Sequence, residues 1–288
     1  MRFAFIREHR GRWPVALMCR VLRVSRNGFY DYVCRPRNGG KHARRREELT
    51  PKVEKIHAEN RQVYGSPRIT RALQGQGERV SENTVAKIMK ERGITGKTPA
   101  KRRPTTTQRD ASQPVAENVL GRDTDTTAPN QKWVADITYL ETSEGWVYLA
   151  AVLDLFSRRV VGWALADHMK AGLVCEALTM ALTRERPGCG LIHHSDRGGQ
   201  YTSGDFQRLL AMHGITASMS RKGNCWDNAV MESFWGTLKR ELGDYWQDKS
   251  AVRPDLFDYI EVFYNRQRLH SALGYKSPAA YEQEHQAA

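Results

Sequence analysis

The chain has few cysteines and no long apolar run. Its five cysteines are scattered over 288 residues without a Cys-x-x-Cys pair, which is typical of reduced thiols in a reducing compartment. No stretch of 18 uncharged apolar residues occurs, and this excludes a conventional transmembrane helix. Residues 1–7 also lack the apolar centre of a signal peptide, so we expect a cytoplasmic protein without a membrane partner.

Acidic residues are scarce in the first 110 positions. This part has 27 Lys and Arg against 10 Asp and Glu, a net charge of +17, whereas the remainder has 18 against 22, a net charge of −4. The asymmetry favours a polyanion-binding N-terminal part, with DNA as partner and association with the nucleoid. A solvated basic surface is the alternative, and a membrane surface is disfavoured because no basic amphipathic helix has a broad apolar face.

Residues 1–40 are predicted to form a small helix-turn-helix-like unit. Pro14 suits the first position of a helix with Leu17 on its apolar face, and Ser25 is a candidate N-cap for a second helix. An ordinary helical hairpin is the alternative interpretation.

A second helical unit of the DNA-binding type is predicted at 41–97, where Ser81 is expected to cap the last helix and Gly93 to end it. Residues 98–130 lose periodicity and contain Lys101-Arg102-Arg103, so they are predicted to form a basic linker.

Beyond residue 130 the pattern changes from helical to strand-like. We predict a catalytic core at 131–245 and a C-terminal helical extension at 246–288. The core pattern predicts strands at 132–141, 146–154, 159–166, 190–195 and 215–219, and helices at 170–185 and 203–213. Three antiparallel strands followed by alternating helices and strands indicate an α/β fold with a mixed sheet flanked by helices.

Three acidic residues are the candidate catalytic and metal-binding groups. Asp136 lies mid-strand, where a buried charge is costly unless it is paired or bound to a metal. Asp196 ends a short apolar strand and precedes a glycine loop. Glu232 follows 36 positions later in a helical segment, and helical angles place it outside the buried arc.

Three carboxylates brought together would repel one another unless cations intervened. Two Mg²⁺ or Mn²⁺ ions suit oxygen-only ligands and nearly neutralise three carboxylates plus one phosphodiester. Such a pair supports in-line displacement at phosphorus, with water or a DNA 3′-hydroxyl as the nucleophile.

The same residues carry a family resemblance. Asp136, Asp196 and Glu232, within His194-Ser195-Asp196-Arg197-Gly198-Gly199-Gln200-Tyr201 and Trp226-Asp227-Asn228-Ala229-Val230-Met231-Glu232-Ser233-Phe234, resemble the integrase-like (DDE) transposases of bacterial insertion sequences, relatives of retroviral integrases. Tyr64-Gly65-Ser66-Pro67-Arg68 and Tyr264-Asn265-Arg266 add to the match. The resemblance implies an RNase H-like core, two divalent metals, cleavage at element ends and strand transfer of the 3′-hydroxyl into DNA.

The resemblance also implies partners. Many members are the downstream product of two frames, so we expect a frameshift fusion with an upstream helix-turn-helix product and a homo-oligomer on DNA. No His and Cys spacing matches the zinc module of retroviral integrases, so we predict no structural zinc.

Further basic and polar residues are candidates for DNA contact. Lys239 shares the helical face of Glu232 and is predicted to contact a phosphate. The other candidates are Arg197, Asn228, Arg240, Arg266 and Arg268. His193 and His194 are expected to pack against the sheet, and Asp154 to cap a hairpin before Ser157.

The sequence therefore predicts a DNA transposase. Two other functions stay open: an RNase H-like nuclease that only hydrolyses, and a DNA-binding regulator with an inactive core.

Overall fold

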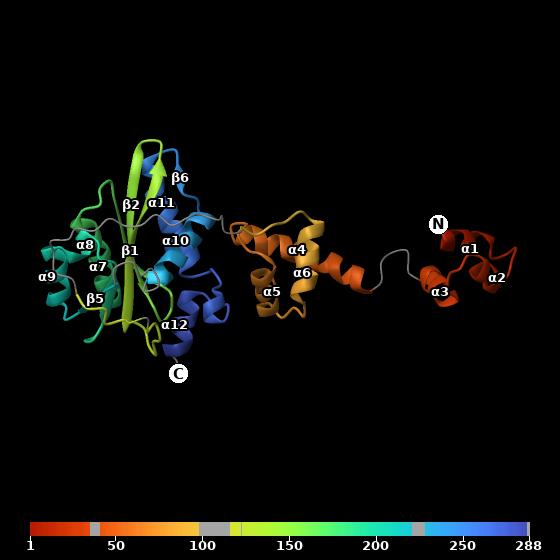
Figure 1. Cartoon of the computed structure of the whole chain (residues 1–288), viewed down its shortest axis with the longest axis horizontal. Coiled ribbons are helices and arrows are strands. Elements are labelled where there is room, and N and C mark those ends of the chain that lie inside the picture. Colours follow the sequence, from red (N-terminus) through yellow and green to blue (C-terminus); the bar gives the residue numbers. More distant parts are fainter. Residues whose placement is uncertain (35–40, 98–115, 122, 221–227, 287–288) are drawn as a thin grey trace. The chain divides into compact units, whose positions relative to one another are not determined.

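The protein is described by a computed structural model (Figure 1) that covers residues 1–34, 41–97, 116–121, 123–220 and 228–286. The chain divides into two compact units, one formed by residues 1–59 and 69–95 and the other by residues 60–68 and 96–288. The predicted basic segment Lys101-Arg102-Arg103 lies outside the described residues. No helix within the described ranges is long and apolar enough to cross a membrane.

The first three helices pack on one another. They are α1 (Arg2–His9), α2 (Val15–Val21) and α3 (Arg26–Cys34). The predicted cap is confirmed, because Ser25 Oγ accepts a hydrogen bond from the Gly28 backbone N–H at 2.9 Å. A small apolar centre consists of Ile6, Met18, Cys19 and Phe29. The predicted pair of helices around the turn is therefore present, with α1 added in front of it.

Three longer helices follow, α4 (Lys41–Glu59), α5 (Ser66–Gly75) and α6 (Glu82–Glu91). Ser81 caps α6 by accepting from the Thr84 N–H, and Gly93 ends it with a φ of 67°, as predicted. The buried side of α6 consists of Val85, Ile88 and Met89. Lys87 and Lys90 are exposed on the other side of α6.

The second unit is built on a six-stranded mixed sheet, in which the five predicted strands are joined by a short sixth strand that was not predicted. Its strands are β1 (Lys132–Thr142), β2 (Gly145–Asp154), β3 (Val160–Ala166), β4 (Ile192–Ser195), β5 (Thr216–Met219) and β6 (Tyr245–Trp246). Their order is β3-β2-β1-β4-β5, and β6 pairs with β1. The first three strands are antiparallel, whereas β4 is parallel to both β1 and β5.

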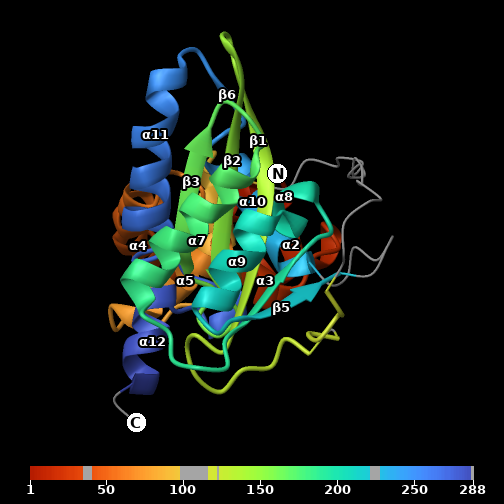
Figure 2. The same cartoon turned by 90° about the vertical axis from the view of Figure 1, so that its left-hand side faces the viewer.

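Helices cover both faces of this sheet (Figure 1). One face carries α7 (Ala171–Glu185), α8 (Gly199–Thr202) and α9 (Gly204–Met212), which lie in front of the strands in Figure 2. The other face carries α10 (Ala229–Glu241), α11 (Lys249–Phe257), its π-helical continuation η2 (Asp258–Tyr264), the short 3-10 helix η3 (Ser271–Leu273) and α12 (Pro278–Gln286). The main apolar core lies between the sheet and α7 to α9.

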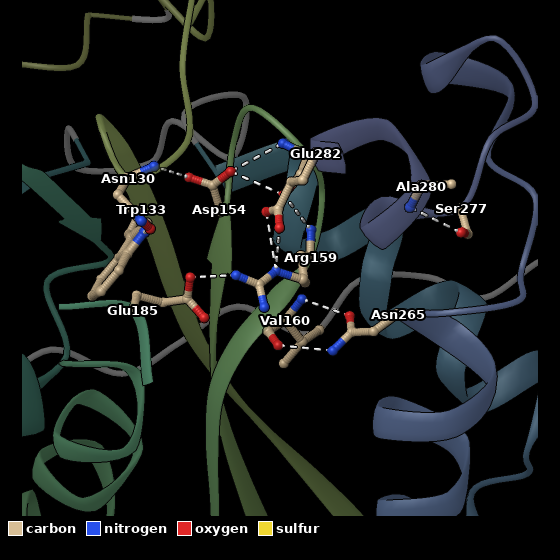
Figure 3. A network of polar contacts seen from close by, with 11 residues as sticks. Asn130, Trp133, Asp154, Arg159, Val160, Glu185, Asn265, Ser277, Ala280 and Glu282 are labelled. Carbon is tan, nitrogen blue, oxygen red and sulfur yellow. Dashed lines mark hydrogen bonds and ion pairs between the residues drawn. The ribbon is translucent and has the colours of Figure 1, made fainter. Parts of the chain in front are cut away.

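The C-terminal elements are fastened to the edge strand β3 by polar contacts (Figure 3). Asn265 accepts a hydrogen bond from the Val160 N–H and donates one to the Val160 carbonyl, both at 3.0 Å. Arg159 forms ion pairs with Glu185 on α7 and Glu282 on α12. The two hydrogen bonds of Asn265 satisfy backbone groups of Val160 that an edge strand would otherwise expose.

Residues 64–68 lie against the C-terminal part of the same unit. The Tyr64 hydroxyl accepts from the Leu269 N–H at 2.8 Å, and Arg68 Nε donates to the Leu269 carbonyl at 2.9 Å. A Cβ on Gly96 would lie 2.6 Å from the Gly65 nitrogen, so the two backbones require glycine there. The predicted domain boundaries stay predictions.

The end of the predicted linker packs on the sheet. The Met219 N–H donates to the Glu117 carbonyl at 3.3 Å, and the Leu120 N–H donates to Ser218 Oγ at 3.0 Å. Leu120 is buried. Residues 116–121 therefore differ from a solvated linker, because β5 offers them hydrogen-bonding partners and an apolar contact.

Candidate active site

Asp136 and Asp196 are placed side by side by the parallel pairing of β1 and β4. The last paired residues are Val134 and His194, and each aspartate stands two positions beyond its strand's member of that pair. Because side chains alternate along a strand, both carboxylates share the face of those two residues. The structure thus brings together two of the three predicted carboxylates from positions 60 residues apart.

Each aspartate accepts a hydrogen bond from a neighbouring N–H. The Trp235 indole N–H donates to Asp136 Oδ2 at 3.0 Å. The Gly198 backbone N–H donates to Asp196 Oδ1 at 2.9 Å, so the glycine loop after β4 closes back onto the carboxylate. Both side chains are consequently held in fixed orientations.

The environment of the two aspartates disfavours their negative charge. Burial raises the pKa of Asp136 to about 7, with further increases from the charges of Asp196 and Glu232, while hydrogen bonds from Ile137 and Trp235 act in the opposite direction. Burial also raises the pKa of Asp196, against the hydrogen bond from Gly198. Within the ranges that the structure covers, no Lys, Arg or His forms an ion pair with either aspartate.

Glu232 lies in the first turn of α10 and is exposed. The buried side of this helix consists of Met231, Phe234, Trp235, Leu238 and Glu241, so the predicted position of Glu232 outside the buried arc is confirmed. Its charge acts on Asp136, yet no three His, Cys, Asp or Glu side chains of the described residues come close enough to enclose one metal ion. Glu232 is therefore near enough to Asp136 to act on it electrostatically, but the three carboxylates are not close enough together to bind one metal ion.

The other end of α10 is fixed by a buried ion pair. Arg268 donates to both carboxylate oxygens of Glu241, each at 2.7 Å. The Tyr259 hydroxyl donates to the same carboxylate at 2.9 Å, and Lys97 Nζ donates to the Glu241 backbone carbonyl at 2.9 Å. A cation at the C-terminus of a helix also interacts favourably with the helix dipole.

This pair overturns the predicted DNA contact of Arg268. Its side chain is 3% exposed, and its guanidinium is engaged by Glu241, so it has no surface to offer to a phosphate. Arg268 was predicted to contact DNA because it lies in a basic segment. A basic segment does not show whether an arginine is exposed or forms a buried ion pair.

Three of the other candidates for DNA contact form hydrogen bonds within the protein, and a fourth is exposed. Lys239 Nζ donates to the Tyr139 carbonyl at 2.9 Å and lies 4.7 Å from the centre of that ring. Arg197 donates to the Ser220 carbonyl at 2.6 Å, and Arg240 to Thr237 Oγ1 at 3.0 Å. Arg266 is exposed.

Asn228 is buried rather than exposed on the Glu232 side. It is the N-cap of α10, with φ of −117° and ψ of 19°. Helical angles therefore do not apply to it, because a cap residue lies outside the helical geometry. Trp226 and Asp227, which precede it in the resembling motif, lie outside the described residues.

The histidines before Asp196 pack in the sheet, as expected. His194 contacts the hydroxyls of Ser218 and Ser220 at 2.9 and 3.0 Å. His193 is buried against Phe206, with 5.3 Å between ring centres. Burial, followed by the charge of His194, lowers the pKa of His193 to about 3, so this ring is neutral.

Asp154 caps the hairpin between β2 and β3, and Tyr201 is a buried residue near the site for which no role was predicted from the sequence. Asp154 Oδ2 accepts from both the N–H and the hydroxyl of Ser157, each at 3.0 Å, so the predicted hairpin cap is confirmed. Tyr201 is fully buried and its hydroxyl has no hydrogen-bond partner among the described residues. Burial, with the charges of Asp136 and Asp196, raises its pKa well above the ordinary value.

The donor set at Asp136 and Asp196 fits a hard divalent cation. Two partly buried carboxylates of like charge lie near each other with raised pKa values and with no paired cation among the described residues. Oxygen ligands of this kind suit Mg²⁺ or Mn²⁺ better than zinc. A bound cation would offset the repulsion that burial makes costly.

The chain is similar to known proteins over nearly its whole length. The integrase core domain family matches residues 126–225, a second integrase core family matches 213–278, and an HTH-like domain family matches 44–102. The transposase InsF of insertion sequence IS3A from Escherichia coli K12 is 42% identical over 284 residues, covering 98% of each chain. The chain belongs to the insertion-sequence transposases of this family. The predicted resemblance and enzyme class are thereby confirmed.

Other members and structures are similar over long stretches. An uncharacterized 31 kDa protein of insertion element IS600 from Shigella sonnei is 44% identical over 270 residues, which is 93% of this transposase and 98% of that protein. Among solved structures, a simian T-cell lymphotropic virus intasome in complex with a PP2A regulatory subunit has 17% identity over 80% of this chain and 74% of that chain, with a TM-score of 0.47.

Proposed function

We propose that this transposase catalyses divalent-metal-dependent cleavage at insertion-sequence ends and transfer of the resulting 3′-hydroxyl into target DNA. The observation that carries the proposal is the pair of neighbouring, partly buried aspartates Asp136 and Asp196 within an integrase core. Glu232, in the first turn of α10, is proposed as the third carboxylate. Divalent cations held by carboxylates can activate water or a hydroxyl of the substrate for attack at phosphorus, so the proposal needs no covalent nucleophile from the protein.

Each of the three carboxylates has a separate role in the proposed metal binding. Asp136 and Asp196 bind the cations from the sheet, with Gly198 and Trp235 fixing their orientation, and Glu232 approaches from the exposed side of α10. If these residues hold two Mg²⁺ or Mn²⁺ ions, the ions would activate the attacking oxygen and stabilise the leaving oxygen. The buried surroundings of the aspartates strengthen their electrostatic interaction with the cations, because the local dielectric is low.

The basic N-terminal part supplies DNA affinity in this proposal. Its charge of +17 over the first 110 residues favours binding to phosphates in a salt-dependent manner. We assign further DNA contacts to Lys239, Arg197, Arg240 and Arg266. Asn228 would act on DNA only if its buried side chain became exposed.

The assembly is proposed to be a homo-oligomer on DNA, localised at the nucleoid. A frameshift fusion with an upstream helix-turn-helix product would add affinity for the element ends.

The direct test is a reaction of the purified protein, or of the fused product, with labelled element ends and Mg²⁺. Asp136→Asn, Asp196→Asn and Glu232→Gln should each abolish cleavage and joining. Asp205→Asn, in an exposed pair with Arg208, is the control and should leave both steps intact. If any of the three site variants cuts and joins like the wild type, the assignment is wrong.

The same experiment separates the other functions. Hydrolysed ends without joined products would favour a nuclease of the RNase H type. Unchanged DNA, together with no heat of Mn²⁺ binding in a calorimetric titration, would favour a DNA-binding regulator.

A further inference from the structure

Trp235 connects the two sides of the candidate active site. It lies on α10 three residues after Glu232, so the two side chains are neighbours on adjacent turns of the helix. Its indole N–H donates to Asp136 Oδ2 on β1 at 3.0 Å. One side chain therefore joins the helix that carries Glu232 to the carboxylate on the central strand.

An indole has one N–H and no acceptor, so its hydrogen bond has a single direction. The terminal torsion of an aspartate is soft, and the two oxygens exchange easily unless a donor selects one of them. Trp235 provides such a donor from a fixed position, because it is 7% exposed and packs on Phe234 with 4.8 Å between ring centres. The rotation of the Asp136 carboxylate is thereby restricted.

We propose that Trp235 is a positioning residue for metal binding: its N–H holds Asp136 so that the carboxylate faces the cation, and it sets the distance between α10 and β1. The inference rests on the proposed function, since it assumes that Asp136 binds a cation. Hydrogen bonds to the ligands of a metal commonly change metal affinity 10- to 100-fold when they are removed. A residue that merely fills the core would change stability but not metal affinity.

The chain offers a matched control in Trp246. It is also 7% exposed, and its indole N–H donates to an aspartate, Asp255 Oδ2, at 2.9 Å. It lies on β6 and donates to a residue of α11. Trp246→Phe therefore removes the same type of hydrogen bond and the same ring volume from a position that does not contact Asp136.

The experiment compares Mn²⁺ binding to the metal-free, full-length variants by calorimetric titration without DNA. Trp235→Phe should raise the Mn²⁺ dissociation constant about tenfold or more, whereas Trp246→Phe should leave it within about twofold of the wild type. The Mg²⁺ concentration that gives half-maximal cleavage should rise in parallel for Trp235→Phe, with recovery of the rate at high Mg²⁺. Equal Mn²⁺ affinity in the wild type and Trp235→Phe would overturn the inference.

Two additions keep the outcome decisive. Replacing Trp235 by 3-benzothienylalanine retains the bicyclic shape and substitutes sulfur for the N–H, so a folded protein with weakened Mn²⁺ binding is expected even if Trp235→Phe unfolds. Asp136→Asn separates the two proposals: if it binds Mn²⁺ like the wild type, the proposed site is wrong. If it loses Mn²⁺ and both changes at Trp235 do not, only the role of Trp235 is wrong.

Discussion

Arg268 and Glu241 form a buried, two-pronged ion pair that joins the last residue of α10 to the segment following the π-helical turn. Both hydrogen bonds measure 2.7 Å, and the two side chains are 3% and 2% exposed. Parallel N–H donors of a guanidinium match the two oxygens of a carboxylate. The pair fixes the end of the helix that carries Glu232, about two and a half turns from that residue.

Removing one member of this pair is expected to be strongly destabilising. Arg268→Gln leaves the Glu241 carboxylate buried without its cation, which costs about 3–5 kcal/mol in the free energy of unfolding. Denaturant titration measures the change. The control Arg208→Gln breaks an exposed pair with Asp205, whose side chains are 75% and 71% exposed, and should change stability by less than about 1 kcal/mol. Wild-type stability of Arg268→Gln combined with lower DNA affinity would instead restore its predicted DNA contact.

Tyr201→Phe removes a buried hydroxyl that has no hydrogen-bond partner among the described residues. An unsatisfied buried polar group is unfavourable, so the variant should be as stable as the wild type or more stable by about 1 kcal/mol. Thermal unfolding in EDTA gives this comparison. A clear loss of stability would mean that the hydroxyl has a partner after all. Reduced cleavage with undiminished stability would place the phenol near the reacting groups, as its electrostatic interaction with Asp136 and Asp196 suggests.

The neutral His193 should make the protein less stable in mild acid. Its pKa is lowered to about 3 by burial, whereas a histidine in the unfolded chain titrates near 6.5. Below about pH 6.5 the unfolded state therefore binds more protons, and this residue's contribution to stability falls as the pH falls. Asp136 acts in the opposite sense, because its pKa is raised to about 7 and its folded form takes up the proton first.

Comparison with His193→Phe isolates the histidine from such opposing groups. Between pH 7.5 and 5.0 the wild type should lose on the order of 1–2 kcal/mol more than the variant, measured by denaturant titration in EDTA. Parallel pH profiles for the two proteins would show that His193 gains a proton as easily in the folded state as in the unfolded chain.

The strands and the buried side of α10 could be predicted because their signals are local. Alternation along a strand and the 3.6-residue period of a helix depend only on neighbouring residues. Alternation correctly predicted β1 to β3, and the helical period correctly predicted that Glu232 is exposed. The proximity of Asp136 to Asp196 was expected from the cost of a mid-strand charge and from the family resemblance, and the register of β1 and β4 now supplies its geometric reason.

Long-range partners could not be predicted in the same way. Arg268 was interpreted as one of several basic residues available to DNA, and Trp235 was not among the candidate site residues. Their functional partners, Glu241 and Asp136, are 27 and 99 positions away. The π-helix at 258–264 also departs from the 3.6-residue period of an α-helix, and it buries Tyr259, Ile260, Phe263 and Tyr264.

Gly162 allows α7 to lie directly on β3, and an added methyl group should separate them. A Cβ at this position would stand 2.2 Å from the Ala177 carbonyl oxygen and 2.7 Å from the Ala181 nitrogen. These are backbone atoms of a helix, which cannot move aside singly. Gly162→Ala should therefore cost about 1–3 kcal/mol or more in the free energy of unfolding.

The matched variant is Gly236→Ala, since Gly236 lies inside α10 and a Cβ there meets no atom within 4 Å. Alanine loses less backbone entropy on folding, so this variant should gain about 0.5–1 kcal/mol. Denaturant titration of both proteins measures the contrast, and equal effects would mean that β3 and α7 are not in close contact. Because Gly236 stands about one turn beyond Glu232, unchanged Mn²⁺ affinity in Gly236→Ala would also show that stiffening α10 leaves the geometry around Asp136 intact.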